Sequence, residues 1–234
     1  MSDMNVVCEI WIASYVFNIK GWEYLKWTLE NCCSIKKASI HLVIHCPGFN
    51  INELILINDN ITIYEQSERF NQLDGYEIIY HKRKLCCNPD DIVLFLDDDD
   101  LILPNAFNEM LSDINIDGRI GLQLLPINNN DEVLPGASNV TLGTLFDFIK
   151  NNKGLVQFVQ DFSGTVTRHK FLGGFFDVKN EFGKLMRCIN LGDITFMNYI
   201  EALPHSGISR TPTIYHRIKE YQSQWITDLF GNRD

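Results

Sequence analysis

Four consecutive aspartates, Asp97 to Asp100, follow the apolar run Ile92 to Leu96, and a second apolar run resumes directly after them. Adjacent carboxylates repel one another, so this arrangement costs free energy unless a ligand offsets the repulsion. Carboxylate oxygens suit Mg²⁺ or Mn²⁺, which bind through one or two carboxylates plus substrate phosphates. The alternative, solvated aspartates that cap a helix after Pro104, needs only one Asp. The cluster therefore favours a divalent-metal site.

The elements that must position this cluster alternate between strand and helix patterns. Strands are expected at 5–14, 38–46, 61–66 and 91–96, and helices at 21–33, 51–57 and 73–87. Such alternation predicts a mostly parallel central sheet with helices on both faces. Ligands of open parallel sheets bind beyond the carboxyl ends of the strands, which is where the four aspartates fall.

The second half of the chain is less regular and predicts a smaller, mixed part of the same domain. Its expected elements are a helix from Pro104 to about Ile114, a strand at 120–127, a helix at 142–150, a strand pair at 155–160 and 163–168, a loop around Gly173-Gly174, a helix from about Asp193 to Leu203 and a strand at 211–218. No linker or internal repeat divides the sequence, so we expect a single α/β domain over residues 1–234.

Composition narrows the classes of partner. The formal charge of −10 and the pI near 5.0 argue against nucleic acid or an anionic membrane, which need a basic face. A small anionic substrate stays possible if a cation accompanies it. No leader pattern and no apolar run of ~20 residues is found, so we expect a cytoplasmic protein without a transmembrane segment, in the host cytoplasm if the source is viral. Seven cysteines without a C-x-x-C pair indicate reduced, mostly buried thiols.

The segment "IVLFLDDDDLILPNAF" resembles the D-x-D segment of family 2-like glycosyltransferases with the GT-A fold. Three further stretches follow in the order of that family. "IWIASYVFNIKGWEYLKWTLENC" resembles the first strand, nucleotide loop and helix, and "SGTVTRHKFLGGFFD" resembles a later strand, helix and G-G-F-D turn. "LGDITFMNYIEAL" resembles the helix that opens with the catalytic acidic residue. The four blocks span roughly Val6 to Arg217.

The resemblance implies a Rossmann-like GT-A domain in which residues 1–100 bind the nucleotide sugar and residues 101–234 bind the acceptor and carry out catalysis. Asp97 matches the first acidic position, near ribose and uracil, and Asp99 matches the metal ligand, with Asp98 and Asp100 as second choices. The residues that match the loop meeting the base and ribose are Ala13, Ser14 and Tyr15.

The resemblance also implies roles for residues in the second half. Asp193 matches the general base of inverting members, although an Asp there can also cap its own helix. Asp177, in "GGFFD", is interpreted as a structural turn acceptor. His216 is a candidate for completing the metal shell or contacting a phosphate, and an ordinary surface or core histidine is the alternative.

Two departures from the family pattern concern the nucleotide. Family members carry Asp at the end of the second strand, where this chain has His45-Cys46. They also favour an Arg-Asn pair before the D-x-D strand, for which Arg83 is the nearest candidate. These departures leave the nucleotide open, and UDP is preferred over GDP.

The expected function is metal-dependent, inverting transfer of a sugar from a nucleotide diphosphate sugar to a hydroxyl of a glycan or other acceptor, by a glycosyltransferase of the hexosyltransferase type. Mn²⁺ or Mg²⁺ would act on the leaving diphosphate, and Asp193 would deprotonate the acceptor. Three alternatives stay open. The first is a retaining transferase, which needs no base, and the second is a catalytically silent nucleotide-sugar-binding domain. The third is a nucleotidyltransferase, but such enzymes usually have a glycine-rich phosphate loop, and the segment "ASYVFNIKG" does not resemble one.

Overall fold

The structure is a computed structural model that describes residues 6–35, 37–126, 156–189 and 192–215, with side chains for all of these except 124–126, 156–161, 182–189 and 192–194. The strands are β1 (Cys8–Tyr15), β2 (Ala38–His45), β3 (Ile61–Glu65), β4 (Ile92–Leu96), β5 (Leu101–Ile102), β6 (Gly118–Pro126), β7 (Val156–Arg168) and β8 (Ile214–Tyr215). The helices are α1 (Ile19–Cys33), α2 (Asn52–Ile55), α3 (Gln72–Arg83), α4 (Asn108–Ser112), the short 3₁₀ helix η1 (His169–Phe171), α6 (Leu172–Ile189) and α7 (Gly192–Glu201).

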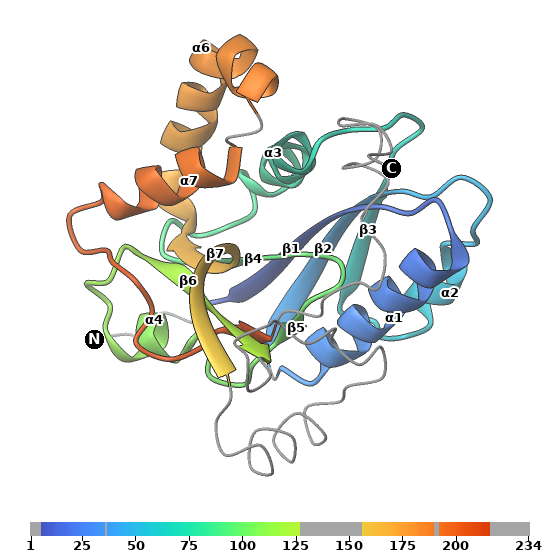
Figure 1. Ribbon diagram of the computed structural model, residues 1–234, viewed down its shortest axis with the longest axis horizontal. Coiled ribbons are helices and arrows are strands. Elements are labelled where there is room, and N and C mark those ends of the chain that lie inside the picture. The colour runs from blue at the N-terminus through green and yellow to red at the C-terminus, as the bar shows by residue number, and fades with distance from the viewer. Residues whose placement is uncertain (1–5, 36, 127–155, 190–191, 216–234) are drawn as a thin grey trace.

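The strands form one sheet in the order β3-β2-β1-β4-β7-β6-β8-β5. The first four run parallel, as the alternation of strands and helices predicts. β7 joins β4 in the antiparallel direction and pairs antiparallel with β6. The predicted α/β architecture, with a parallel front half and a mixed back half, is confirmed (Figure 1).

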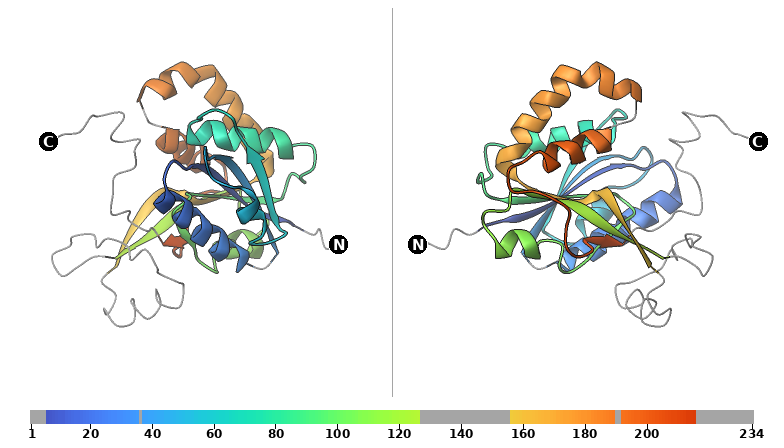
Figure 2. Two further views of the ribbon diagram at one scale, coloured as in Figure 1. Left: turned by 90° about the vertical axis from the view of Figure 1, so that its right-hand side faces the viewer. Right: turned by 60° about the vertical axis from the view of Figure 1, so that its left-hand side comes forward.

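Helices cover both faces of the sheet (Figures 1 and 2). Alternate residues of β1 point to opposite sides, so Ile10 and Ile12 belong to the core under α1, while Trp11 belongs to the core under α3, α6 and α7. All five residues of β4 are buried. A strand buried on both faces reads as an unbroken apolar run, and this is what "IVLFL" shows.

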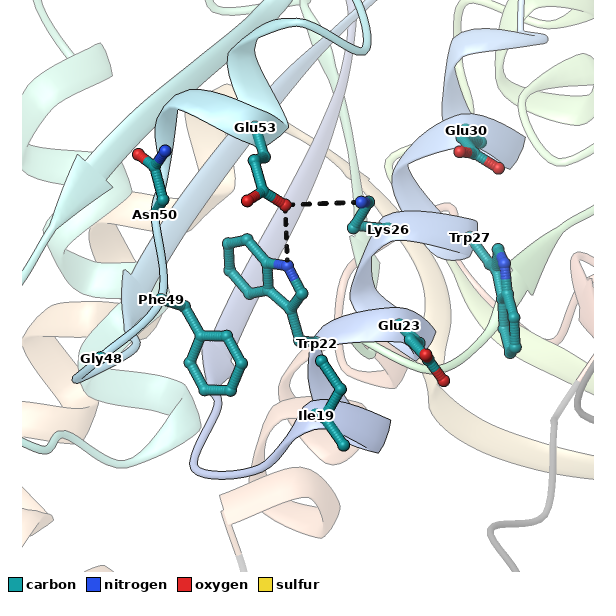
Figure 3. A pocket seen from close by; sticks show the side chains of 10 residues that line it. All are labelled: Ile19, Trp22, Glu23, Lys26, Trp27, Glu30, Gly48, Phe49, Asn50 and Glu53. Carbon is teal, nitrogen blue, oxygen red and sulfur yellow. Dashed lines mark hydrogen bonds and ion pairs between the residues drawn. The ribbon is translucent and has the colours of Figure 1, made fainter.

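On one face, α1 packs beside α2 through an aromatic stack (Figure 3). The Trp22 ring of α1 lies 5.0 Å from the Phe49 ring, with an angle of 21° between the planes. Trp22 Nε1 donates a hydrogen bond to Glu53 of α2 at 3.4 Å. Residues that precede α2 are thereby fixed against α1 on the outside of the sheet.

Several sequence-based boundaries differ from the structure. The helix expected from Pro104 begins only at Asn108, because the chain first turns, with the Ala106 N–H bonded to the carbonyl of Leu103. The strand pair expected at 155–168 is the single strand β7. β7 continues through 161–162, where the sequence predicts a break, and Gly164 lies within it with a φ of +82°.

The expected loop at Gly173-Gly174 is the first turn of α6. A Cβ on Gly173 would lie 2.8 Å from the hydroxyl oxygen of Tyr80, and one on Gly174 would lie 2.7 Å from that of Tyr199. The glycines therefore permit close helix packing. Asp177 is an exposed residue within α6, so its interpretation as a turn acceptor is wrong. The helix predicted at 142–150 lies outside the described residues.

No helix in the part of the chain that the structure describes is long and apolar enough to cross a membrane. The cysteines whose side chains are described carry free thiols, and Cys8, Cys32 and Cys46 among them are buried.

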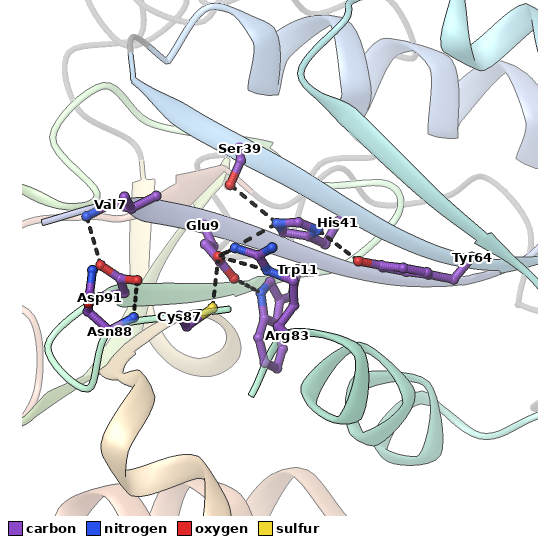
Figure 4. A network of polar contacts seen from close by, with 10 residues as sticks. All are labelled: Val7, Glu9, Trp11, Ser39, His41, Tyr64, Arg83, Cys87, Asn88 and Asp91. Atoms are coloured by element: carbon purple, nitrogen blue, oxygen red, sulfur yellow. Dashed lines mark hydrogen bonds and ion pairs between the residues drawn. The ribbon is translucent and has the colours of Figure 1, made fainter. Parts of the chain in front are cut away.

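A buried network of polar side chains lies at the amino end of β1 (Figure 4). Glu9 is fully buried and accepts hydrogen bonds from Trp11 Nε1 at 2.7 Å, from Arg83 Nε at 3.0 Å and from the Cys87 thiol at 3.2 Å. Burial works to raise the pKa of Glu9, but the hydrogen bonds from Arg83 and Trp11 and the nearby His41 hold this pKa below its usual range. Glu9 is therefore ionised and held at the centre of the network.

His41 faces this network from β2, with its Nε2 3.7 Å from a Glu9 oxygen. Its ring stacks on Tyr64 at 6.2 Å between centroids, and its Nδ1 lies 3.2 Å from the Tyr64 hydroxyl. Burial lowers the pKa of His41 from 6.5 to about 4, against the opposing effect of Glu9. His41 is therefore neutral in the folded protein at neutral pH.

We expect the free energy of unfolding to fall as the pH is lowered from about 6.5 towards 4. The unfolded chain binds the His41 proton near pH 6.5 and the folded protein only near pH 4, so acid favours the unfolded state by up to about 3 kcal/mol. Urea unfolding at pH values between about 7 and 4.5 measures this slope. His41→Gln should flatten it, and the exposed control His205→Gln should not. An unchanged slope in His41→Gln would assign the acid sensitivity to other groups.

Candidate active site

The four aspartates form the turn between β4 and β5, at the carboxyl edge of the parallel strands. The Asp100 N–H donates to the Asp97 carbonyl at 3.2 Å and closes this turn. Asp97 and Asp98 are half-buried, whereas Asp99 and Asp100 are only 7% and 0% exposed. Buried carboxylates need hydrogen-bond donors, so the surrounding elements decide whether the turn can form.

One donor comes from β1, the parallel neighbour of β4. Ile12 is in register with Leu96, so Ser14, two residues further on, stands level with Asp98. The Ser14 hydroxyl donates to Asp98 Oδ2 at 2.6 Å. From α1, the Thr28 hydroxyl donates to the backbone carbonyl of Asp98 at 3.0 Å. Asp98 is thus held through both its side chain and its backbone.

Two further donors come from α3 and β7. The amide of Gln72, the first residue of α3, donates to Asp97 Oδ1 at 2.5 Å. The hydroxyl of Ser163 in β7 accepts from the Asp97 N–H at 3.1 Å and donates to Asp100 Oδ2 at 2.6 Å. Ser163 therefore ties the first aspartate of the turn to the last one.

An aromatic pair ends the neighbouring strands β1 and β2 at the same edge. The Tyr15 and His45 rings stack with centroids 5.3 Å apart and 11° between the planes. His45 Nδ1 donates to the Gln66 carbonyl at 2.9 Å, so this nitrogen carries a hydrogen. The exposed Arg69 places its guanidinium carbon 4.7 Å from the centre of the Tyr15 ring. The Tyr15 ring thus contacts both the His45 ring and the Arg69 guanidinium, which lies over its face.

The structure brings together most of the residues that the sequence singles out in the first half. Ser14 and Tyr15 lie at the edge with the aspartate turn. Ala13 faces α3 instead, since a Cβ on Gly75 would lie 2.8 Å from the Ala13 Cβ. Sequence reasoning missed Gln72, Ser163 and Arg69, and it treated His45 only as a departure from the family pattern. The available signal was that Tyr15 and His45 both stand at the carboxyl ends of their expected strands, and the structure pairs them in register.

Arg83 is not brought to this edge. α3 runs antiparallel to the strands, from Gln72 beside Asp97 to Arg83 beside Glu9, at the amino end of β1. The Arg83 guanidinium is committed to the buried Glu9 carboxylate (Figure 4). Its predicted contact with the nucleotide has no support in this geometry.

The remaining predicted residues lie in the back half. His216 falls outside the described residues. Asp193 is the second residue of α7, and its side chain is not among those described. Phe196 of α7 packs on Phe95 of β4 with ring centroids 4.7 Å apart, and Ile200 packs on Gly118, level with the amino half of β4. α7 therefore begins toward the carboxyl edge of the sheet.

The aspartate turn fits a divalent ion that shares its coordination with a substrate. Among the described side chains, no group of three or more His, Cys, Asp and Glu could hold a metal ion alone. Mg²⁺ and Mn²⁺ need only one or two carboxylates when substrate phosphates complete the shell. Asp97 and Asp99 supply such oxygen ligands, so these residues suit the predicted ion.

Comparisons with known proteins identify the fold. No family model and no curated protein matches the sequence. Among solved structures, S. aureus TarS 1-349 in complex with UDP-GlcNAc matches with a TM-score of 0.52 and 12% identity, over 93% of this chain and 60% of that chain. The same protein in complex with UDP matches with a TM-score of 0.52 and 12% identity, over 90% of this chain and 60% of that chain. A 4-diphosphocytidyl-2C-methyl-D-erythritol synthase matches with a TM-score of 0.51 and 10% identity, over 94% of this chain and 95% of that chain.

These similarities establish the class of fold. The chain spans about 60% of the length of the TarS chains that it matches. At identities of 10 to 12% the likeness concerns the fold alone. The chain has a GT-A-like α/β fold, as the sequence resemblance predicted.

We expect Ser163→Ala to lower the free energy of unfolding by about 1–3 kcal/mol. The substitution removes the hydrogen bond to the fully buried Asp100 and the acceptor of the Asp97 N–H. Urea unfolding measures the change, and the exposed Ser67→Ala is a matched control that should stay within about 0.5 kcal/mol of the parent. Equal stability of the two variants would show that Ser163 does not support the turn.

Proposed function

We propose that this chain is a glycosyltransferase that moves a sugar from a nucleotide diphosphate sugar, with a UDP-sugar preferred, to a hydroxyl of a glycan or other acceptor. The observation that carries the proposal is the aspartate turn, whose carboxylates are oriented by donors from β1, α3 and β7 at the ligand-binding edge of the sheet. The fold shared with a UDP-GlcNAc complex supports the same donor class.

The donor nucleotide is proposed to lie along the ends of β1 and β2. Tyr15 and His45 offer a stacked aromatic surface for the base, and Ser14 and Asp97 offer polar groups for the ribose. Arg69, whose guanidinium lies over the Tyr15 ring, supplies a positive charge at this edge of an acidic protein. Because it can form two parallel hydrogen bonds, its guanidinium suits a phosphate. Arg69 replaces Arg83 as the candidate cation for the donor.

Asp99 and Asp97 are proposed to hold Mn²⁺ or Mg²⁺, with His216 as a further predicted ligand. The ion would supply Lewis-acid neutralisation of the leaving diphosphate. The chain's own contribution is orientation. Gln72 fixes the Asp97 carboxylate, and the turn hydrogen bond from Asp100 to the Asp97 carbonyl fixes the backbone around Asp99. Orienting the carboxylates in advance reduces the reorganisation needed when donor and metal bind.

Asp193 is proposed to act as the general base of an inverting reaction. The direction of α7, which begins toward the carboxyl edge of the sheet, supports this role because it brings the start of the helix to the side of the aspartate turn. There the carboxylate would accept the proton of the acceptor hydroxyl as its oxygen attacks the sugar carbon from the face opposite the diphosphate.

Donor binding is tested by thermal shift with UDP-, GDP- and dTDP-sugars, with and without Mn²⁺. At ~100 times the dissociation constant, a ligand stabilises the folded state by about 2.7 kcal/mol, or roughly 5 to 10 °C for a chain of this size. Asp99→Ala should abolish the metal-dependent part and keep the fold, since it removes one charge from a repelling cluster. The exposed Asp177→Ala is the matched control. If no nucleotide sugar shifts the melting temperature with metal present, the proposal fails.

Nucleotidyl transfer is the second candidate, favoured by the synthase structure that covers 94% of this chain and 95% of its own. The same thermal-shift panel separates the two functions when CTP and UTP are added to it. A free nucleoside triphosphate that stabilises the protein more than every nucleotide sugar would favour nucleotidyl transfer. The reverse order would favour glycosyl transfer.

We expect Asp193→Asn to lower turnover by about 10²- to 10⁴-fold with donor affinity almost unchanged, because Asn keeps the size of Asp but cannot accept the proton. Asn caps helices nearly as well as Asp, so a residue that only caps α7 would leave the rate intact. Asp177→Asn is the control. NMR of the product should show the anomeric configuration opposite to that of the donor. A retained configuration, or near-normal turnover of Asp193→Asn, would assign the reaction to another mechanism.

A further inference from the structure

A pocket lies on the outside of the sheet, between α1 and the segment from Gly48 to α2 (Figure 3). Its volume is about 570 Å³, within the range of small-molecule sites. None of the aspartates and neither Ser14 nor Tyr15 lines it, so it is separate from the candidate active site. One wall is an outward face of α1, on which Ile19, Trp22, Glu23, Lys26, Trp27 and Glu30 recur at helical spacing. The other wall carries Phe49, Asn50 and Glu53.

The charge of the side chains that line the pocket favours a ligand of opposite charge. Three glutamates and one lysine give the pocket a formal charge of −2. Lys26 points to Glu53 with its Nζ 3.5 Å from a carboxylate oxygen, so this pair largely cancels itself. The excess charge therefore lies on Glu23 and Glu30, for which the described residues provide no ion-pair partner. Such a lining repels phosphates and carboxylates and attracts cations.

The aromatic side chains indicate which class of cation fits the pocket. Trp27 is half-buried and lies between Glu23 and Glu30 along α1, four residues after the first and three before the second, whereas Phe49 lines the pocket beside Trp22 (Figure 3). The face of an aromatic ring is negative, so it attracts an organic cation within about 6 Å. Inorganic ions prefer several converging oxygen ligands, and no such group of side chains is present among the described residues. Carboxylates beside aromatic faces thus suit an ammonium group on an apolar or hydroxylated body.

We infer that this pocket binds a small organic ammonium ion. The ammonium lies against Trp27 and is neutralised by Glu23 and Glu30, while Phe49 contacts the body of the ligand and Asn50 forms hydrogen bonds with its hydroxyl groups. The hydrogen bond from Trp22 Nε1 to Glu53 and the Trp22–Phe49 stack hold the two walls at a fixed separation. The site is therefore formed before the ligand arrives, which lowers the cost of binding. This inference does not rest on donor binding at the aspartate turn.

The test uses choline, putrescine and 3,3-dimethylbutan-1-ol, the neutral isostere of choline. Binding is followed through the NMR signal of the Trp22 Nε1–H in the full-length protein at low ionic strength. We expect saturable shifts with choline or putrescine, and at least a 10-fold weaker response to the isostere. Choline separates a quaternary from a primary ammonium site, because putrescine carries only primary groups. UDP with Mn²⁺ should leave the affinity for the cation unchanged, so this result is independent of the proposed transferase activity.

Variants assign the binding to the pocket. Glu23→Gln and Glu30→Gln keep side-chain size on an exposed helix face, and together they should weaken cation binding by about 10-fold. Trp27→Leu should weaken it about 3-fold or more, because it removes the aromatic face between the two glutamates but keeps an apolar side chain. The exposed Glu68→Gln is the matched control. Equal binding of choline and its isostere, unchanged affinity in the double variant, or no response to either cation would each overturn the inference.

Discussion

Electrostatic repulsion within the turn from Asp97 to Asp100 is the constraint on which this structure depends. Four carboxylates share one turn, and two of them are removed from water, where repulsion is strongest. The turn holds because β4 lies between β1 and β7 in the sheet, so donors reach it from both sides. Ser14 comes from one neighbour and Ser163 from the other, while α3 adds Gln72. The strand order is thus what makes the cluster possible.

Buried carboxylates at the two ends of the sheet have different hydrogen-bond donors. At the amino end, the Arg83 guanidinium forms an ion pair with Glu9 and cancels its charge inside the protein. At the carboxyl end, Ser14, Gln72 and Ser163 are neutral donors, which orient carboxylates without cancelling their charge. The first arrangement suits a structural role. The second keeps negative charge directed at a fixed place, as a site for a metal ion requires.

How far the sequence predicts this arrangement depends on the range of the interactions. β4 and the aspartates were found because the apolar run and the carboxylates are adjacent in the chain. Gln72 and Ser163 were missed because they lie 25 and 66 residues from Asp97 and meet it only after the sheet has formed. Arg83 was assigned as the nearest candidate before the D-x-D strand, although a helix between parallel strands must end at the amino edge, far from the carboxyl ends where ligands bind. A break was expected at 161–162, whereas β7 runs without interruption from Val156 to Arg168.

Ser163 also explains why the two functional halves proposed from the sequence cannot be independent. It belongs to the back half, yet its single hydroxyl holds the backbone of Asp97 and the carboxylate of Asp100 in the front half. β7, which carries it, also supports α7 through Phe162, whose ring packs on Phe196 with centroids 5.0 Å apart. A displacement of β7 would therefore move the proposed metal ligands and the helix of the proposed base together. One antiparallel strand inserted beside β4 thus couples the proposed donor side of the site to the proposed acceptor side.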